Sequence, residues 1–463
     1  MKKKEQYKRL LSFLDSAIII FLLTAVFSYI WFHFYDKSDV LLKTFWRRGN
    51  YVVIGLYGVL VFLFLKLYGG LRIGHMRVFE VLYSQILSLL CVNGFTYLQL
   101  CLIGHWRFLD NLLPIVLMTV IDIVLAVIWV VISRTLYLKL YPAHKVVVIH
   151  GNLNPGLLIR KLNSRKDRYD VAEMISIDQG VDAVKEKIRQ YRCALLADIP
   201  DDDRNRLIKF CFANDIRCYA VPKISDIMIK SSENIYQFDT ALMLFRNQGL
   251  PVEQQFIKRL FDIVASLIAI VLASPFMLVI AVCIKAYDGG PVFFTQERLT
   301  KDGEVFRVFK FRSMRVENEK KEYCLTRKDD DRITPVGKII RNIHFDELPQ
   351  LFNILKGDMS LVGPRPETPQ VAQQYTEILP EFSYRLKVKA GLTGFAQVYG
   401  KYNTTPYDKL KMDLTYIERY SFLLDLKLML LTFKILFQKE NTEGIEAWQT
   451  TAAPDLEPEK AEK

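Results

Sequence analysis

The sequence is poor in the residues that build metal centres and disulfide frameworks. Its seven cysteines include no Cys-x-x-Cys pair, and none stands at zinc spacing from any of the six histidines. An odd number of scattered cysteines favours reduced thiols in a cytoplasmic setting. These absences exclude a structural zinc module and a disulfide-stabilised secreted scaffold.

The chain also lacks the composition of a disordered, collagenous or purely soluble protein. Of its 463 residues, 51% are hydrophobic and 24% are charged, and the mean hydropathy is +0.14. This is too apolar for a soluble chain and too charged for one that lies wholly in lipid. Most of the net charge of +12 falls in residues 1–150, beside apolar segments, which favours membrane topology over nucleic-acid binding.

Four long apolar runs predict four transmembrane helices over residues 1–140. Each is long enough to cross a hydrocarbon core of about 30 Å. The runs cover residues 13–32, 51–68, 79–103 and 112–133. The lysine-rich start lacks a small-residue cleavage site, so we expect an uncleaved anchor with a cytoplasmic N-terminus. In this topology the 34–50 loop faces outward although it carries basic residues, which disagrees with the positive-inside rule but does not reverse the prediction. Asp122, inside the fourth run, is open to a functional or a structural hydrogen-bonding role.

Residues 141–245 alternate strand and helix patterns, which predicts a Rossmann-like α/β domain with a parallel sheet. The first strand, His144–His150, is followed by a loop over 151–156. That loop lacks the G-x-G-x-x-G spacing of a dinucleotide site. We therefore favour a scaffold or regulatory domain over nucleotide binding here.

A fifth apolar run covers residues 260–284 and contains Ser274-Pro275 at its middle. By length alone it is a fifth transmembrane helix. Pro275 removes a helix hydrogen bond and disfavours helical geometry at Ser274. The competing interpretation is a helix–break–helix that enters and leaves the same leaflet.

The most informative motif is the acidic pair Asp346-Glu347, which precedes an apolar pattern of helical spacing. Pro349 is favoured in a first helical turn, so both carboxylates are expected at a helix N-terminus. That end favours ionised carboxylates and binds phosphate. Asp346 then suits a nucleophile, and Glu347 suits a Mg²⁺ ligand or a base. The structural alternative is simple N-capping by Asp346.

Basic side chains and tight loops surround this pair in the sequence. Together the cations predict a phosphate-binding set, because arginine suits bidentate phosphate contact. The predicted set is Lys310, Arg312, Arg341 and Arg365. A second glycine-rich loop offers groups that read a sugar or a base, or else a turn before a strand. Its candidates are Gly391, Thr393, Gly394 and Gln397.

With these residues assembled, the chain resembles the bacterial polyprenyl-phosphate sugar-1-phosphate transferases, the large monotopic phosphoglycosyl transferases that initiate exopolysaccharide and capsule assembly. The resemblance spans nearly the whole chain, and its motifs are most specific across residues 256–440. They are Lys258-Arg259 with Phe261-Asp262, Ser274-Pro275, Gly290–Phe294 with Gln296–Arg298, Phe309–Met314, Asp346–Gln350, Gly363–Pro366 and Gly391–Gly394. One departure is Lys389-Ala390 before Gly391, where many relatives have proline.

The resemblance implies a membrane protein of α plus α/β class with a mainly α catalytic domain over residues 286–440. It implies a re-entrant membrane helix hairpin over 256–285, broken at Ser274-Pro275. This topology keeps the catalytic domain on the cytoplasmic face of the inner membrane. We interpret residues 441–463 as a disordered tail.

The resemblance also implies the reaction. A UDP-sugar gives its sugar-1-phosphate to undecaprenyl phosphate, and UMP is released. Asp346 attacks the β-phosphate, and Glu347 assists, with both carboxylates holding Mg²⁺; the cationic set binds phosphate. Expected partners are the UDP-sugar, undecaprenyl phosphate, membrane lipid and a second copy in a homodimer, with no nucleic acid. The alternative is an inactive membrane scaffold or regulator that senses a nucleotide through its α/β domain.

Overall fold

The computed structural model describes residues 7–36, 47–104, 106, 111–151, 155–237, 239–245, 249–315, 332–400 and 404–436. The chain divides into two compact units, Met1–Val221 and Pro222–Lys463, which are described separately. The predicted tail over 441–463 lies outside the described residues.

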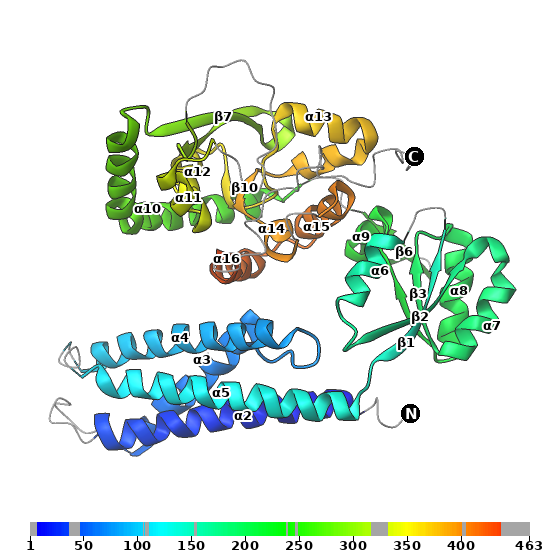
Figure 1. Cartoon of the computed structure of the whole chain (residues 1–463), viewed down its shortest axis with the longest axis horizontal. Helices are drawn as coiled ribbons and strands as arrows, with labels where there is room; N and C mark the ends of the chain where they lie inside the picture. The colour runs from blue at the N-terminus through cyan, green and yellow to red at the C-terminus, as the bar shows by residue number, and fades with distance from the viewer. Residues whose placement is uncertain are drawn as a thin grey trace. The chain divides into compact units, whose positions relative to one another are not determined.

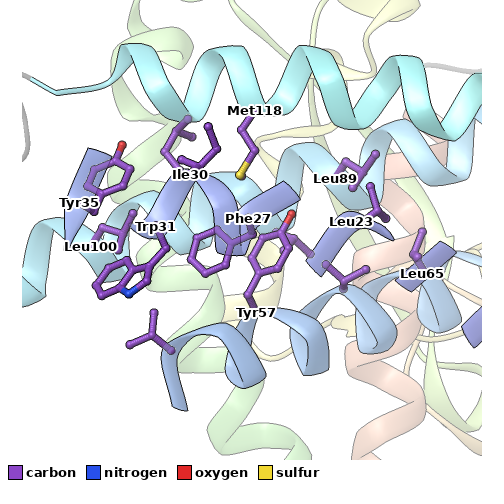
Figure 2. Packing of buried hydrophobic residues seen from close by; sticks show 14 of the residues in the cluster. Leu23, Phe27, Ile30, Trp31, Tyr35, Tyr57, Leu65, Leu89, Leu100 and Met118 are labelled. Atoms are coloured by element: carbon purple, nitrogen blue, oxygen red, sulfur yellow. The ribbon is translucent and has the colours of Figure 1, made fainter. Parts of the chain in front are cut away.

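The first unit begins with apolar helices that pack side by side (Figure 1). They are α2 (Lys8–Ile30), α3 (Arg47–Tyr68), α4 (Val78–Ile103) and α5 (Leu113–Leu140), with the short π-helix η1 (Trp31–Tyr35) after α2. Their inner faces carry large aromatic side chains, and the rings of Phe27 and Tyr57 stack with centroids 4.2 Å apart (Figure 2). Many outer side chains are apolar and exposed, as expected for helices that contact lipid.

A polar cluster lies within this apolar bundle around the buried Asp122. The Tyr57 hydroxyl lies 3.0 Å from Asn93 Oδ1 and 3.3 Å from Asp122 Oδ2. Asn93 Nδ2 donates to Asp122 Oδ2 over 3.1 Å. The structure thus gives Asp122 the structural hydrogen bonds that were one of its two expected roles, from two neighbouring helices.

The rest of the first unit is a four-stranded parallel sheet in the order β2-β1-β3-β4, with helices on both faces. Its strands are β1 (His144–His150), β2 (Tyr169–Ser176), β3 (Cys193–Ala197) and β4 (Arg217–Ala220). Helix α6 (Gly156–Asn163) covers one face, and α7 (Val181–Tyr191) and α8 (Asp201–Ala213) cover the other. The predicted parallel α/β sheet is present, although the sequence analysis did not identify β2.

The α/β unit ends earlier than the predicted boundary at residue 245. Helix α9 (Ile224–Ser231) belongs to the second unit, where it packs on α15 (Pro406–Glu418). The Ser231 hydroxyl donates to Glu418 over 3.0 Å. The antiparallel pair β5 (Glu233–Gln237) and β6 (Thr240–Leu244) follows, and it also belongs to the second unit.

The second unit mixes strands with helices, so the mainly α expectation understates its strand content. It contains an antiparallel pair, β7 (Phe293–Leu299) with β8 (Val305–Phe311), and a parallel pair, β9 (Ser360–Val362) with β10 (Gly391–Thr393). Around them lie α11 (Pro335–Asn342), α12 (Gln350–Lys356), α13 (Pro369–Ile378), α14 (Phe395–Tyr399), α15 and α16 (Phe422–Leu436). One apolar core joins strands and helices.

Helix α10 (Val252–Asp288) contains Pro275 and runs through it as one helix. Figure 1 shows that α10 bends sharply into two arms. The helix is therefore bent rather than interrupted, and the expected re-entrant break at Ser274-Pro275 stays a prediction. The proline leaves the carbonyl of Val271 without its usual N–H donor. The Ser274 hydroxyl donates to that carbonyl over 2.8 Å. The Ser-Pro pair therefore bends the helix without leaving a bare carbonyl.

Within the described residues, five helices are long and apolar enough to cross a membrane by length and composition: those of the bundle and α10. These helices support a membrane protein.

Candidate active site

The acidic pair lies in a single 3-10 turn, η5 (Phe345–Glu347), between α11 and α12. His344 precedes this turn with a φ of +55°, a conformation rare for a residue with a side chain. Burial lowers the pKa of His344, which keeps its imidazole neutral at pH 7. The strained backbone conformation of His344 is of a kind that is common at functional sites. Pro349 then caps α12, so Asp346 does not serve as its N-cap.

Two of the predicted cations converge on one oxygen of Glu347. Lys310 Nζ, from β8, donates to Glu347 Oε1 over 2.7 Å. Arg365 Nη2, from the loop after β9, donates to the same oxygen over 2.8 Å. The Glu347 side chain is only 13% exposed, whereas that of Arg365 is 44% exposed. Arg365 therefore reaches both the buried carboxylate and the solvent from which a substrate arrives.

The buried Asn353 fixes the element that carries Lys310 against the helix that follows the acidic pair. Its Oδ1 accepts from the backbone N–H of Phe309 over 2.9 Å, and its Nδ2 donates to the Arg307 carbonyl over 2.7 Å. Because both groups belong to β8, the Asn353 side chain fixes the position of β8 relative to α12. Asn353 is not among the predicted site residues, although an asparagine between apolar helix residues is itself a signal of buried hydrogen bonding.

The Arg365 loop crosses the second glycine-rich loop at backbone contact distance. A Cβ added to Gly391 would lie 2.0 Å from the Gly363 nitrogen, and one added to Gly394 would lie 2.0 Å from the Gly363 oxygen. Thr393 Oγ1 lies 2.6 Å from Thr432 Oγ1, and Gln397 Nε2 donates to the Leu392 carbonyl over 2.9 Å. In this structure the predicted sugar or nucleotide loop supports the Arg365 loop through these internal contacts.

A buried ionic cluster holds the other side of the Arg365 loop. Arg385 Nη2 donates to the Arg365 carbonyl over 2.7 Å and lies 2.9 Å from Asp413 Oδ2. Arg385 and Lys409 also contact Glu367, which immediately follows Pro366. Burial opposes ionisation of Glu367, but these cations hold its pKa well below the usual range. The loop backbone is therefore fixed while the Arg365 side chain stays accessible.

The pKa values of the two carboxylates of η5 are shifted in opposite directions. Burial, and then the negative charge of Glu347, raise the pKa of Asp346 to about 6. Burial also opposes ionisation of Glu347, but the charges and hydrogen bonds of Arg365 and Lys310 hold its pKa well below the usual range. Glu347 therefore stays ionised, and Asp346 changes charge just below neutral pH.

The remaining predicted cations have different surroundings. Arg341, on α11, lies near enough for its charge to favour the ionised form of Asp346. Arg312 is instead buried in an ion pair with Asp288, at the end of α10. A Cβ on Gly290 would collide with the Arg312 guanidinium, so that turn is built around the arginine. Three of the four predicted cations thus act on the acidic pair, and Arg312 joins α10 to β8.

A cavity of about 440 Å³ opens beside the loop that carries Arg365. Its walls come from the end of β7, the Pro364–Glu367 loop, α13 and the segment that follows it. Arg365 belongs both to this cavity and to the ion pair with Glu347. A ligand that fills the cavity is therefore within reach of the arginine beside the acidic pair.

The acidic pair fits a metal that is shared with substrate phosphates rather than one held by protein alone. Within the described residues, no group of three or more His, Cys, Asp or Glu side chains is arranged to hold a metal ion. Among the same residues, no hydrogen bond or ion pair reaches the Asp346 carboxylate, and those on Glu347 all reach Oε1. Mg²⁺ typically binds one or two carboxylates together with substrate phosphates, which suits this donor set.

Comparisons with known proteins match this region. The family model for bacterial sugar transferase matches residues 253–439. The chain is 38% identical over 252 residues to the UDP-N-acetylgalactosamine-undecaprenyl-phosphate N-acetylgalactosaminephosphotransferase of Aeromonas hydrophila, covering 52% of this chain and 58% of that protein. It is 45% identical over 181 residues to the UDP-glucose:undecaprenyl-phosphate glucose-1-phosphate transferase of Klebsiella pneumoniae, covering 38% and 39%.

A shorter relative is covered almost completely. It is the uncharacterized sugar transferase EpsL of Bacillus subtilis (strain 168), 37% identical over 203 residues, which are 43% of this chain and 98% of the relative. The chain belongs to the bacterial sugar transferase family. It spans about half the length of the two longer relatives that it matches.

Proposed function

We propose that this protein transfers a sugar-1-phosphate from a UDP-sugar to undecaprenyl phosphate and so initiates exopolysaccharide or capsule repeat-unit synthesis. The observation that carries the proposal is the asymmetric acidic pair. Glu347 is held by Lys310 and Arg365, while no described group contacts the neighbouring Asp346 carboxylate through a hydrogen bond or ion pair. A nucleophile needs free lone pairs, and a phosphate site needs adjacent cations; this turn offers both.

In the proposed first step, an Asp346 oxygen forms a bond to the β-phosphorus of the UDP-sugar. The bond from that phosphorus to the bridging oxygen breaks, and UMP leaves with the electron pair. In the second step, an oxygen of undecaprenyl phosphate attacks the same phosphorus. The Asp346 carboxylate is released, and the lipid carries a sugar diphosphate. The transfer therefore takes two successive displacements at one phosphorus, in place of a single direct reaction between the soluble donor and the lipid acceptor.

The cations give these steps their electrostatic support. Arg365 and Lys310 lie beside the acidic pair, where they would attract the phosphates of a bound UDP-sugar, and part-burial would strengthen that attraction. Arg365 is the more accessible of the two and is the side chain proposed to turn from Glu347 toward a substrate phosphate.

We propose that Glu347 stays negatively charged and binds the metal ion, rather than removing a proton. A carboxylate whose pKa lies well below its usual range is a weak base. Asp346 and Glu347 would hold Mg²⁺, which when bound neutralises phosphate charge and polarises the phosphoryl oxygens. The residues of the chain keep Glu347 ionised and therefore ready to bind that cation.

The proposal includes the location of the protein. The bundle helices and α10 anchor it in the inner membrane, with α10 re-entering from the cytoplasmic face and the transferase unit in the cytoplasm. The bend at Pro275 supports this path, because two arms at an angle suit entry and exit on one side. A homodimer remains an expectation from the family. The scaffold alternative is disfavoured, since a nucleotide-sensing scaffold has no need of an asymmetric acidic pair.

Product analysis tests the proposal. The membrane-embedded protein is given undecaprenyl phosphate, Mg²⁺ and single UDP-sugars labelled at the β-phosphate. We expect UMP as the nucleotide product, and the label in the lipid fraction, with one sugar or a few. UDP as the product would indicate glycosyl transfer instead. No nucleotide release across glucose, galactose and their N-acetylated forms, from protein shown to be folded, would favour the scaffold.

A further inference from the structure

Helix α10 carries charged residues that its apolar sequence does not require. Lys258 and Asp262 are only 8% and 3% exposed, and Arg259 lies between them. Burying a charge is costly unless it is paired and hydrogen bonded, so each of these groups needs a partner. The partners of Arg259 and Asp262 lie on α12 and β9, next to the acidic pair and Arg365, and the partner of Lys258 lies on α16.

Two of these charges hold consecutive residues of β9. Asp262 Oδ1 accepts from the backbone N–H of Leu361 over 3.0 Å. Lys258 Nζ donates to Asp425 Oδ2 over 2.6 Å, and the Tyr416 hydroxyl lies 2.9 Å from Asp425 Oδ1.

The same Tyr416 hydroxyl lies 3.1 Å from the carbonyl oxygen of Val362. It carries one proton, shared between the carboxylate and that carbonyl. The first arm of α10 thus holds the N–H of one β9 residue directly and the C=O of the next through a short relay. Gly363, Pro364 and Arg365 follow β9 immediately. A shift of Val362 therefore moves the arginine that contacts Glu347.

The third charge holds the helix that follows the acidic pair. Arg259 donates through Nη1 to the Ile354 carbonyl over 2.6 Å and through Nη2 to the Leu355 carbonyl over 2.7 Å. These carbonyls belong to the last turn of α12, which lacks acceptor partners within the helix. A guanidinium there satisfies them and also complements the helix dipole.

The second arm of α10 packs against the turn of the acidic pair itself. Phe276 meets Phe345 edge to face, with ring centroids 6.2 Å apart. Phe345 and Leu348, which bracket the carboxylates, belong to the same apolar cluster as Met277 and Ile280. Both arms of one helix therefore contact the segments that carry the two halves of the Glu347–Arg365 ion pair.

We infer that Lys258, Arg259 and Asp262 are positioning residues for the proposed transfer, with Asp425 and Tyr416 as the relay from Lys258. They set the distance between Arg365 and Glu347, so that the seating of the apolar helix determines whether Arg365 can reach a substrate phosphate beside the acidic pair. This inference rests on the proposed function for its catalytic meaning, and on the contacts above for its geometry.

Two neighbouring tyrosines provide a matched test. The rings of Tyr416 and Tyr420 both lie near Lys258, with centroids 6.0 and 5.6 Å from its Nζ. Among the described residues, the buried Tyr420 hydroxyl has no hydrogen-bond partner. Tyr416→Phe removes the relay, and Tyr420→Phe removes an equivalent hydroxyl that takes no part in it.

We expect Tyr416→Phe to lower kcat/KM about fivefold, as one lost hydrogen bond predicts, and to raise KM for the UDP-sugar more than it lowers kcat. KM rises because a less restrained Arg365 binds the substrate phosphate less well. Tyr420→Phe should match the wild type in both respects. A merely structural role would lower the unfolding temperature and leave KM unchanged.

A second pair of variants protects the test against misfolding. Asp262→Asn keeps an oxygen that accepts from Leu361, whereas Asp262→Leu removes it. We expect the asparagine to keep the wild-type KM for the UDP-sugar and the leucine to raise it as Tyr416→Phe does. Equal KM and kcat/KM for Tyr416→Phe and Tyr420→Phe in an active protein would overturn the inference.

The proposed function can fail separately. Calorimetric binding of the UDP-sugar to Asp346→Asn protein reports the placement of Arg365 without turnover, and it should be about fivefold weaker once Tyr416→Phe is added. A wild type that releases no UMP, together with this loss of binding, would contradict the proposed function and keep the positioning role. Equal binding with and without Tyr416→Phe would overturn the positioning role whatever the activity.

Discussion

Arg365 donates to Glu347 Oε1 over 2.8 Å. In the sequence, Glu347 precedes α12 and the loop that carries Arg365 follows it. This pair makes Glu347 a strong acid and leaves its neighbour Asp346 a weak one. The division of roles in the proposed reaction depends on it. A carboxylate that is engaged by two cations holds charge, and one with free oxygens attacks.

The first prediction concerns pH. With the pKa of Asp346 at about 6, the nucleophile is largely ionised at neutral pH and becomes protonated below it. We expect kcat/KM for UMP release to fall about tenfold per pH unit below pH 6. The measurement is a pH profile in a fixed lipid composition and at constant ionic strength. A rate that stays flat down to pH 5 would contradict Asp346 as the ionised nucleophile.

The second prediction concerns Arg365→Gln. The loss of one cation weakens phosphate binding and raises the pKa of both carboxylates, since Arg365 lowers each of them. We expect kcat/KM to fall about a hundredfold and the acid limb to move to higher pH. Arg307→Gln, an exposed arginine on the same unit, is the control and should change neither. A variant that loses activity with an unmoved acid limb would show that Arg365 does not act on the acidic pair.

The third prediction links function to stability. Folding raises the pKa of Asp346, so its charged form opposes folding above pH 6, and this cost declines as the pH falls below the folded pKa. Asp346→Asn removes the charge. We expect it to abolish turnover and yet to raise the unfolding temperature at pH 7.5 by about 2–4 °C. At pH 5 the difference should be about half as large, and it should vanish only below the unfolded pKa of 3.8. A lower unfolding temperature at pH 7.5 would contradict this balance of charges.

The fourth prediction concerns the bend in α10. Pro275→Ala restores a backbone donor to Val271 and removes the steric cause of the bend. We expect a straighter α10 that no longer packs both arms, and activity lowered at least about tenfold. Ser274→Ala removes one hydroxyl bond and keeps the proline, so it should retain most activity. Equal activity in Pro275→Ala and the wild type would show that the bend is dispensable.

The fifth prediction concerns the crossing of two loops. Gly391→Ala places a Cβ 2.0 Å from the backbone nitrogen of Gly363, which the backbone cannot accommodate without moving. We expect a loss of more than about 2 kcal/mol in the free energy of unfolding, together with weaker activity. Gly94→Ala, which meets nothing within 4 Å, is the control and should be near neutral. Unchanged thermal unfolding of Gly391→Ala would show that the loops do not need this close approach.

The sequence predicted the parts of the site whose chemistry is local. Asp346-Glu347 stand out as adjacent acids before a proline and an apolar helix, and Lys310 and Arg365 stand out in basic and proline-stiffened motifs. Their pairing could not be predicted, because it depends on how β8 and the loop after β9 fold around α12. Arg312 carries the same local signal as Lys310, yet its partner is Asp288 on α10.

The same distinction holds for the fold. Periodicity located the apolar helices and the strand β1, whose central residues are buried in succession. Strand β2 alternates half-buried and exposed side chains over most of its length at the edge of its sheet, a weaker signal. Pro275 indicated a local irregularity, but whether a proline bends or breaks a helix depends on tertiary packing and on Ser274. Gly391 and Gln397 indicated a ligand loop, and only the crossing backbone of Gly363 reveals their supporting contacts.

The most direct test of the central claim is a single turnover without acceptor lipid. Membrane-embedded protein is mixed with Mg²⁺ and the UDP-sugar that supports UMP release, and undecaprenyl phosphate is withheld. We predict a burst of about one UMP per active protein and a phosphosugar mass on the peptide that contains Asp346, both absent in Asp346→Asn. No burst and no modified peptide, in a preparation that turns over rapidly once the lipid is added, would contradict Asp346 as the covalent nucleophile.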